Sequence, residues 1–165
     1  MNNAKAIELS IAETMRNYAE VGGDVTVRAW QSMNFDGKWD EDTDRTYPAL
    51  DIRTSPQQSD DTQQTMFCDT TIICATQMDD DKSHQIVSDM YEAVDSLIDK
   101  LFKQFIDGAG GKELTYLNAR IEEHASTKID TPVSLTWGDP LSPFEDQGLN
   151  MIGIGLRIHY GRSDY

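Results

Sequence analysis

Three consecutive aspartates, Asp79–Asp81, are the first candidates for a chemical role in this sequence. Neighbouring carboxylates can hold a hard cation such as Mg²⁺ or Ca²⁺. Acidic residues also cap helices and are stabilised by the helix dipole, each by about 0.3–1 kcal/mol. A strand-like run ends just before the triplet and a long amphipathic pattern follows, while only His84 stands nearby as a further ligand. The triplet therefore predicts a helix start with Asp80 or Asp81 as the N-cap, and a metal site is the alternative.

A second group of acids has the spacing of a calcium-binding loop. Asp40, Asp42 and Asp44 match the first, third and fifth positions of an EF-hand loop. Asp51 falls at the twelfth position, where the loop needs a bidentate glutamate, and Arg45 occupies the sixth, where it needs glycine. We expect a solvated acidic loop here, with a weak, adventitious cation site as the alternative.

The other catalytic and cofactor motifs are incomplete. Residues 108–113 resemble a phosphate loop in composition but not in spacing. Residues 153–161 lack the third glycine and the following helix of a dinucleotide-binding fingerprint. His84, His124 and His159 stand on three separate elements without metal-ligand spacing, and there is no G-x-S-x-G nucleophile motif. The sequence therefore predicts no catalytic residues, no metal ligands and no cofactor.

Charge is the strongest feature of the composition. The chain has 29 acidic residues against 14 lysines and arginines, a net charge of −15. Phosphate backbones repel such a chain, so a DNA-gripping role is disfavoured. The acidity favours solubility, or else a surface that stays close to nucleic acid without binding it.

Length and cysteine usage indicate a single folded unit. A chain of 165 residues forms one domain, residues 1–165, large enough to bury a core. Cys68 and Cys74 are six residues apart in one strand-like run, a span of roughly 20 Å that excludes a disulfide. We expect buried thiols in a reducing compartment. The start has no signal-peptide pattern and no run is long enough to cross a membrane, so we expect neither secretion by that route nor a membrane partner.

Hydrophobic periodicity predicts the elements that would position these residues. Helical spacing covers residues 4–21 and 82–106, and strand-like alternation covers 24–33, 47–55, 65–77, 131–140 and 150–162. Residues 112–126 fit either type, and they lean to a strand because a glycine-rich break precedes them without a good cap. The order predicts an α+β fold: an antiparallel or mixed sheet with an N-terminal helix and one long central helix packed on one face. Within that helix, Val94, Leu97, Leu101 and Phe102 are predicted to be buried against the sheet.

Large apolar side chains also occur where no periodic element explains them. They lie in or beside polar, glycine- and proline-rich connections: Phe35, Trp39, Trp137, Leu141 and Phe144. Aromatic residues concentrate at protein interfaces. We expect these five residues to contact another subunit or a partner.

The whole pattern resembles the tail-terminator and tail-completion proteins of tailed bacteriophages. After an N-terminal helix, the resemblance rests on "YPALDIRTS", "TIICATQMDDDKSHQIVSDMYEAVDSLIDKL", a glycine break and the last strand "GIGLRIHYG". Such proteins typically place a short acidic turn between the third strand and the long helix, and they end on a strand. The acidic loop at 36–44 and the long connection at 138–149 have no match in that pattern.

The resemblance implies a structural virion protein without enzyme activity. Its subunits would form a ring, commonly six-fold, that caps the tail tube and joins it to the head connector. The expected partners are other copies of the chain, the tail tube protein and the head–tail connector proteins. It would be assembled in the host cytoplasm and reside in the tail or neck of the virion, where an acidic lumen lets DNA pass without specific binding. The alternatives are an acidic adaptor that binds another protein and a small metal-dependent hydrolase.

Overall fold

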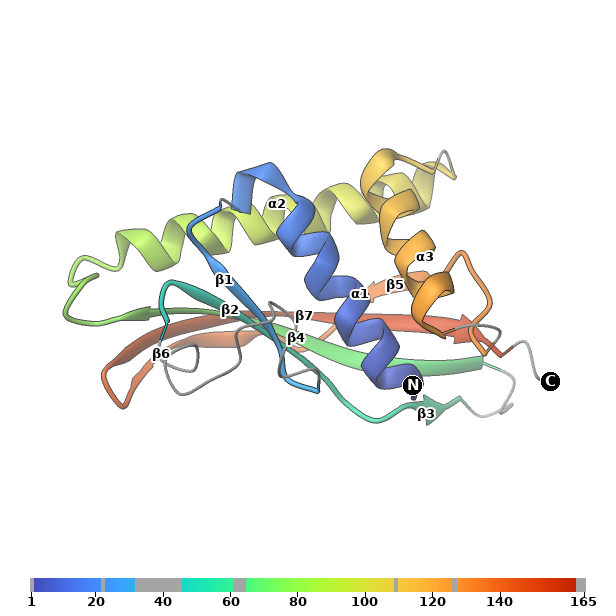
Figure 1. Ribbon diagram of the computed structural model, residues 1–165, viewed down its shortest axis with the longest axis horizontal. Helices are drawn as coiled ribbons and strands as arrows, with labels where there is room; N and C mark the ends of the chain where they lie inside the picture. The colour runs from blue at the N-terminus through green and yellow to red at the C-terminus, as the bar shows by residue number, and fades with distance from the viewer. Residues whose placement is uncertain are drawn as a thin grey trace.

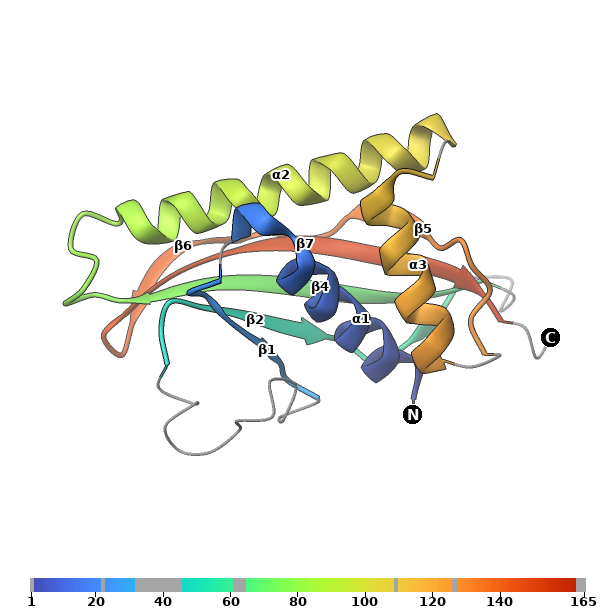
Figure 2. The same cartoon turned by 45° about the horizontal axis from the view of Figure 1, so that its top comes forward.

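The computed structural model describes residues 2–21, 23–31, 46–60, 65–108, 110–125 and 128–162. These residues form an α+β fold with a mixed sheet, as the sequence predicts. The helices cover one face of the sheet, and the long helix runs along its length (Figures 1 and 2).

The elements follow one another in a simple order. The helical segments are α1 (Asn3–Asn17), the short 3₁₀ turn η1 (Ala19–Val21), α2 (Gln85–Asp107) and α3 (Lys112–Ala125). The strands are β1 (Thr26–Ala29), β2 (Ala49–Thr54), β3 (Gln58–Ser59), β4 (Thr65–Gln77), β5 (Ser134–Trp137), β6 (Leu141–Asp146) and β7 (Leu149–Gly161).

The centre of the sheet is the antiparallel pair β4 and β7. The two strands are 13 residues each and pair along their whole length, from Thr65 opposite Gly161 to Gln77 opposite Leu149. The strand order is β1-β2-β4-β7-β5, with β3 beside β4 and β6 beside β7. Only β1 and β2 pair in parallel among the described strands, which makes the sheet mixed.

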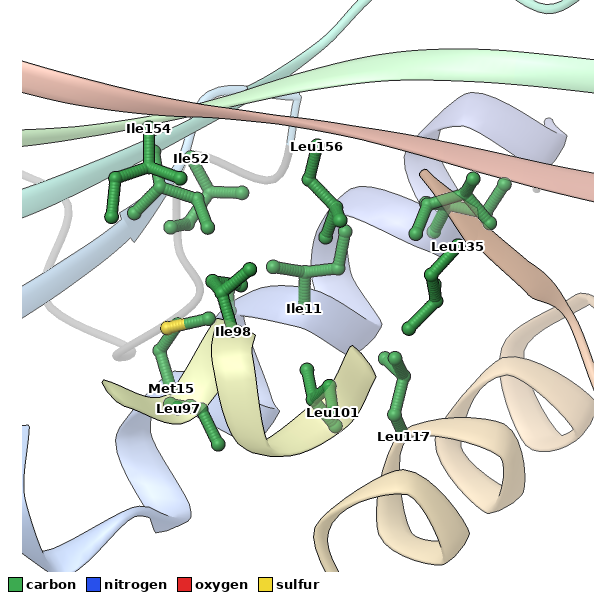
Figure 3. Packing of buried hydrophobic residues seen from close by; sticks show 14 of the residues in the cluster. Ile11, Met15, Ile52, Leu97, Ile98, Leu101, Leu117, Leu135, Ile154 and Leu156 are labelled. Atoms are coloured by element: carbon green, nitrogen blue, oxygen red, sulfur yellow. The ribbon is translucent and has the colours of Figure 1, made fainter. Parts of the chain in front are cut away.

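The core lies between the helices and the inner face of the sheet. Figure 3 shows its side chains pointing toward one another from all three helices and from the strands. They include Ile11 and Met15 of α1, Leu97, Ile98 and Leu101 of α2, Leu117 of α3, and Ile52, Leu135, Ile154 and Leu156 of the sheet. Burial of this apolar surface is the dominant favourable term in folding.

The N-terminal helix begins as predicted and ends earlier. The side chain of Asn2 accepts a hydrogen bond from the Lys5 backbone N–H at 2.7 Å, which caps the first turn. The α-helix ends at Asn17, and a single 3₁₀ turn continues to Val21.

The strand preferred for residues 112–126 is wrong: the segment forms α3. Leu114, Leu117 and Ile121 are buried at helical spacing. The N–H of Leu114 donates to Oε1 of Gln104 at 2.9 Å, so part of the cap comes from α2. Because this partner lies ten residues upstream, the local sequence shows no cap.

The connection at 138–149 contains a strand, β6, that the sequence did not predict. Ser142–Asp146 is exposed, so no apolar alternation marks it. Its pairing with β7 holds it in place, with Phe144 opposite Met151 and Asp146 opposite Leu149.

The long helix α2 buries most of its predicted apolar stripe. Val94, Leu97 and Leu101 are buried, whereas Phe102 is only partly so. The Phe102 ring stacks on Trp137 of β5, with ring centroids 4.6 Å apart. The predicted burial of Phe102 against the sheet is therefore only partial, because its ring packs on the exposed Trp137 of the end strand β5.

The two cysteines are free and buried, as their spacing predicts. Burial raises the pKa of Cys68 to about 11 and that of Cys74 to about 12, so both remain protonated thiols at neutral pH. None of the described helices combines the length and apolar composition needed to cross a membrane.

Replacing Leu97 or Leu101 with alanine should lower the free energy of unfolding by about 2–5 kcal/mol, because each substitution leaves a cavity in the core. Urea denaturation followed by circular dichroism measures this change. Asp99→Ala is the matched control, since Asp99 is exposed on the same helix and only pairs with Lys103. Equal losses in the core variants and the control would contradict the proposed packing.

Candidate functional site

The acidic turn between β4 and α2 divides into exposed and buried carboxylates. Asp79 and Asp80 are exposed, whereas Asp81 is only 3% exposed. The Asp81 carboxylate accepts hydrogen bonds from the backbone N–H groups of Ile86 and Val87, at 2.9 and 3.0 Å. Asp81 thus satisfies first-turn donors of α2 and serves helix initiation.

The N-cap position itself differs from the prediction. It is His84, whose backbone is left-handed (φ 61°) and whose side chain makes no capping bond. Neither Asp80 nor Asp81 is the N-cap, since α2 begins at Gln85. The left-handed residue turns the chain so that Asp81, three residues earlier, faces the helix start.

A small polar network fixes this turn to the sheet. The Thr76 hydroxyl donates to Asp81 at 2.8 Å, and Nδ2 of Asn150 donates to the Asp81 carbonyl at 2.9 Å. Burial pushes the pKa of Asp81 upward, but the bonds from Ile86, Val87 and Thr76 outweigh it, and the pKa is lowered. The carboxylate therefore stays ionised inside the protein.

The described residues offer no clear metal centre. Within the ranges that the structure covers, no three His, Cys, Asp or Glu side chains are grouped closely enough to hold an ion. Asp40, Asp42 and Asp44 of the calcium-like spacing lie outside the described residues. Asp51 is on β2, where it accepts a hydrogen bond from Arg28 at 2.7 Å.

A groove of about 550 Å³ lies between the first turns of α2 and the β6–β7 hairpin. We call it the hairpin groove. Its lining includes Val87, Tyr91 and Ile152, which give it apolar walls. His84 and Glu145 line it too and form a hydrogen bond from α2 to β6, with Nε2 and Oε1 3.0 Å apart and both side chains about half exposed (53% and 52%).

The strand next to this groove is an edge strand. Among the described strands, β6 pairs only with β7, so its other side presents unpaired backbone groups. Exposed edges are templates for pairing with another chain, and prolines and charges limit such pairing. In β6, Pro143, Glu145 and Asp146 have these restraining properties.

The three predicted interface residues that the structure describes do not form one patch. Trp137 is 54% exposed and stacks on Phe102, so it belongs to the helix side of the sheet. Phe144, 37% exposed, pairs with Met151, and the partly buried Leu141 pairs with Gly153. Side chains of directly paired residues share a face, so Leu141 and Phe144 lie on the face away from the helices. Phe35 and Trp39 lie outside the described residues.

The face of the sheet away from the helices has a cluster that sequence reasoning missed. Arg157 of β7 is in register with Asp69 of β4 and donates two hydrogen bonds to it, at 2.7 and 3.1 Å. The same guanidinium lies 4.2 Å from the ring centre of Phe67. Arg157 and His159 stand out as polar residues of the last strand, but only the β4–β7 register identifies their neighbours.

Two acids on α1, one buried and one partly buried, were also missed. Glu8 is fully buried and accepts hydrogen bonds from the backbone N–H groups of Gln31 and Thr54. Burial raises its pKa. Glu13 contacts Arg120 and His124 of α3. Both groups hold α1 to its neighbours, and both pair residues far apart in the chain.

Asp81→Ala should lower the free energy of unfolding by about 2–3 kcal/mol at neutral pH, because it leaves buried donors without an acceptor. Asp79→Ala and Asp80→Ala are matched controls and should change it little, since both residues are exposed. Thermal or urea denaturation of the three variants measures the difference.

The effect of Asp81→Ala should also depend on pH. The folded-state pKa lies below the ordinary value of 3.8, so the carboxylate contributes stability above that pH and loses it as the pH falls through the folded-state pKa. The gap between wild type and variant should therefore shrink below pH 3.8. A constant gap, or micromolar Mg²⁺ binding that vanishes in the variant, would contradict the structural role.

The structure thus places the buried carboxylate of Asp81, the hairpin groove and the exposed edge strand β6 at one end of the molecule. At the left end of Figures 1 and 2, the β4–α2 connection and the β6–β7 hairpin lie close to each other. In comparisons with known proteins, no family model and no curated protein matches this chain.

Proposed function

We propose that this protein is a structural subunit of a bacteriophage tail, which forms a ring at the end of the tail tube and joins it to the head connector. The observation that carries the proposal is the order of the elements: an N-terminal helix, strands, the acidic turn, the long helix α2 and a final long strand. This order in an α+β fold is the pattern by which the sequence resembles tail-terminator and tail-completion proteins.

The two ends of the sheet support assembly into a ring. A ring former meets its neighbours through two different surfaces, because each contact is heterologous. In the described part of the sheet, β1 is at one end and β5 and β6 are at the other, so the two edges differ in length and composition. The β5–β6 edge includes Trp137 and Phe144, exposed aromatic residues of the kind that concentrate in interfaces.

The charge of the chain fits the passage of DNA. With a net charge of −15, a ring of these subunits repels the phosphate backbone if its acidic side chains face the channel. DNA then passes through the ring without specific binding. The tail tube protein and the connector proteins are the proposed partners.

A second candidate is an acidic adaptor that binds another protein. The hairpin groove favours it, because apolar walls beside an exposed edge strand provide a binding site for a partner segment. This candidate needs no ring, and the size of the assembly separates the two.

A phage that lacks this protein should produce heads and tails that do not join, because the ring connects them. Electron microscopy of the lysate, with the wild-type protein supplied in trans as a control, measures this outcome. Light scattering of the purified protein, alone and with tail tubes, reports the ring. Intact, infectious virions without the protein would contradict the proposal.

The double variant Trp137→Ala with Phe144→Ala should fold but fail to form the ring or to complete tails, because it removes an exposed aromatic side chain from each face of the sheet along the β5–β6 edge. Ile106→Ala is the matched control, since Ile106 is 76% exposed near the far end of α2. Equal assembly of both variants would place the interface elsewhere. The same test applies to Phe35→Ala with Trp39→Ala.

A further inference from the structure

We propose that the hairpin groove and the free edge of β6 bind an extended, apolar segment of a partner protein that presents an arginine or lysine side chain to the groove. Three independent features of the described residues carry this inference: the unpaired edge, the apolar walls and a buried acceptor that lacks a donor. The site belongs to the single chain, so the inference goes beyond ring formation and does not require it.

The edge strand supplies the backbone recognition. β6 pairs with β7 on one side only, and Ser142–Asp146 is exposed. An extended segment that adds to such an edge gains main-chain hydrogen bonds, while its alternate side chains point to the two faces of the sheet. One set of those side chains would therefore point to the helix side, where the hairpin groove lies beside α2.

The walls of the groove suit a long aliphatic stem. Val87 and Tyr91 of α2 and Ile152 of β7 line it, and its volume of about 550 Å³ accommodates several side-chain groups. The methylene groups of arginine and lysine bury against such apolar surfaces while the charged end reaches a polar partner.

A buried acceptor selects a donor at the end of that stem. Asn150 lines the groove and is 2% exposed, and its Oδ1 has no hydrogen-bond partner among the described residues. The amide cannot be reversed without loss, because Nδ2 donates to the carbonyl of Asp81, which can only accept. Oδ1 itself is covered, so an incoming N–H group reaches it once the Asn150 side chain shifts toward the groove, and the new hydrogen bond then removes the cost of leaving Oδ1 unpaired.

The charges around the groove select a cation as the carrier of that donor. Glu145 lines the groove from β6, and its carboxylate is exposed there. The His84 ring contacts the Glu145 carboxylate in the structure. Because the His84 side chain is half exposed, it can swing away and a guanidinium can take its place beside Glu145. Arginine is always charged and donates in a fixed fork, which makes it the better match to a carboxylate and an amide oxygen.

A blocked, fluorescein-labelled peptide of alternating valine and threonine with one central arginine tests the site on the full-length protein. The matched peptide carries citrulline, which keeps the shape of arginine but replaces its charged guanidinium with a neutral urea that has fewer N–H donors. Fluorescence anisotropy should show the arginine peptide binding about tenfold tighter, the effect expected for one charge-assisted contact. Equal affinity for the two peptides would overturn the proposal.

Two further comparisons separate the groove from general attraction to an acidic protein. Glu145→Gln should weaken the arginine peptide about tenfold, whereas Glu92→Gln, which removes the same charge from an exposed site on α2 outside the groove lining, should leave it nearly unchanged. A peptide with N-methyl groups on the alternate backbone nitrogens that would face β6 should not bind, because it cannot donate main-chain hydrogen bonds to that edge. Equal weakening by both variants, or unchanged binding of the methylated peptide, would overturn the site.

The outcome is independent of the tail experiments. If the protein joins heads to tails but does not distinguish the two peptides, the groove proposal is wrong and the ring proposal is unaffected. If it binds the arginine peptide selectively but tails form without it, the groove proposal is supported and the ring proposal is wrong.

Discussion

The β4–β7 ladder is the constraint on which the rest of the structure depends. Its thirteen paired residues fix which side chains of the two longest strands meet the helices and which meet the opposite face. A slip by one residue would exchange the two faces, exposing Ile72 and Ile154 and burying the Asp69–Arg157 pair. The same register sets Asn150 opposite Thr76, which allows both to contact Asp81. The core and the acidic turn are therefore consequences of one pairing.

The sequence predicted those helices and strands that bury one apolar face against the hydrophobic core and leave the other face polar. α1, β2, β4, α2 and β7 have clear periodicity because one face of each meets the core. α3 and β6 lack that local information for different reasons. Part of the cap of α3 is a side chain of α2, Gln104, and β6 is exposed and depends on β7 for its position. Tertiary contacts decide both, and a local pattern cannot record them.

The candidate site was accessible from sequence only in part. Three aspartates in a row indicated a helix start, but nothing in their order distinguishes the buried Asp81 from its exposed neighbours. Asn150 reaches Asp81 from 69 positions away, and Glu145 reaches His84 from 61 positions away. The groove is formed by two segments that only the fold brings together. Trp137 and Phe144 stood out by residue type, yet the pairing register places them on opposite sides of the sheet.

The two cysteines have a practical consequence for experiments on this surface. Cys68 and Cys74 are fully buried and remain protonated at neutral pH, so maleimides and other thiolate-selective reagents have no ready target in the native chain. The folded protein therefore behaves toward such reagents as if it contained no cysteine. A single cysteine introduced at Ser142, an exposed position on β6, would be the selectively labelled one. It offers a site for a spin label or a photo-crosslinker without prior removal of the native thiols.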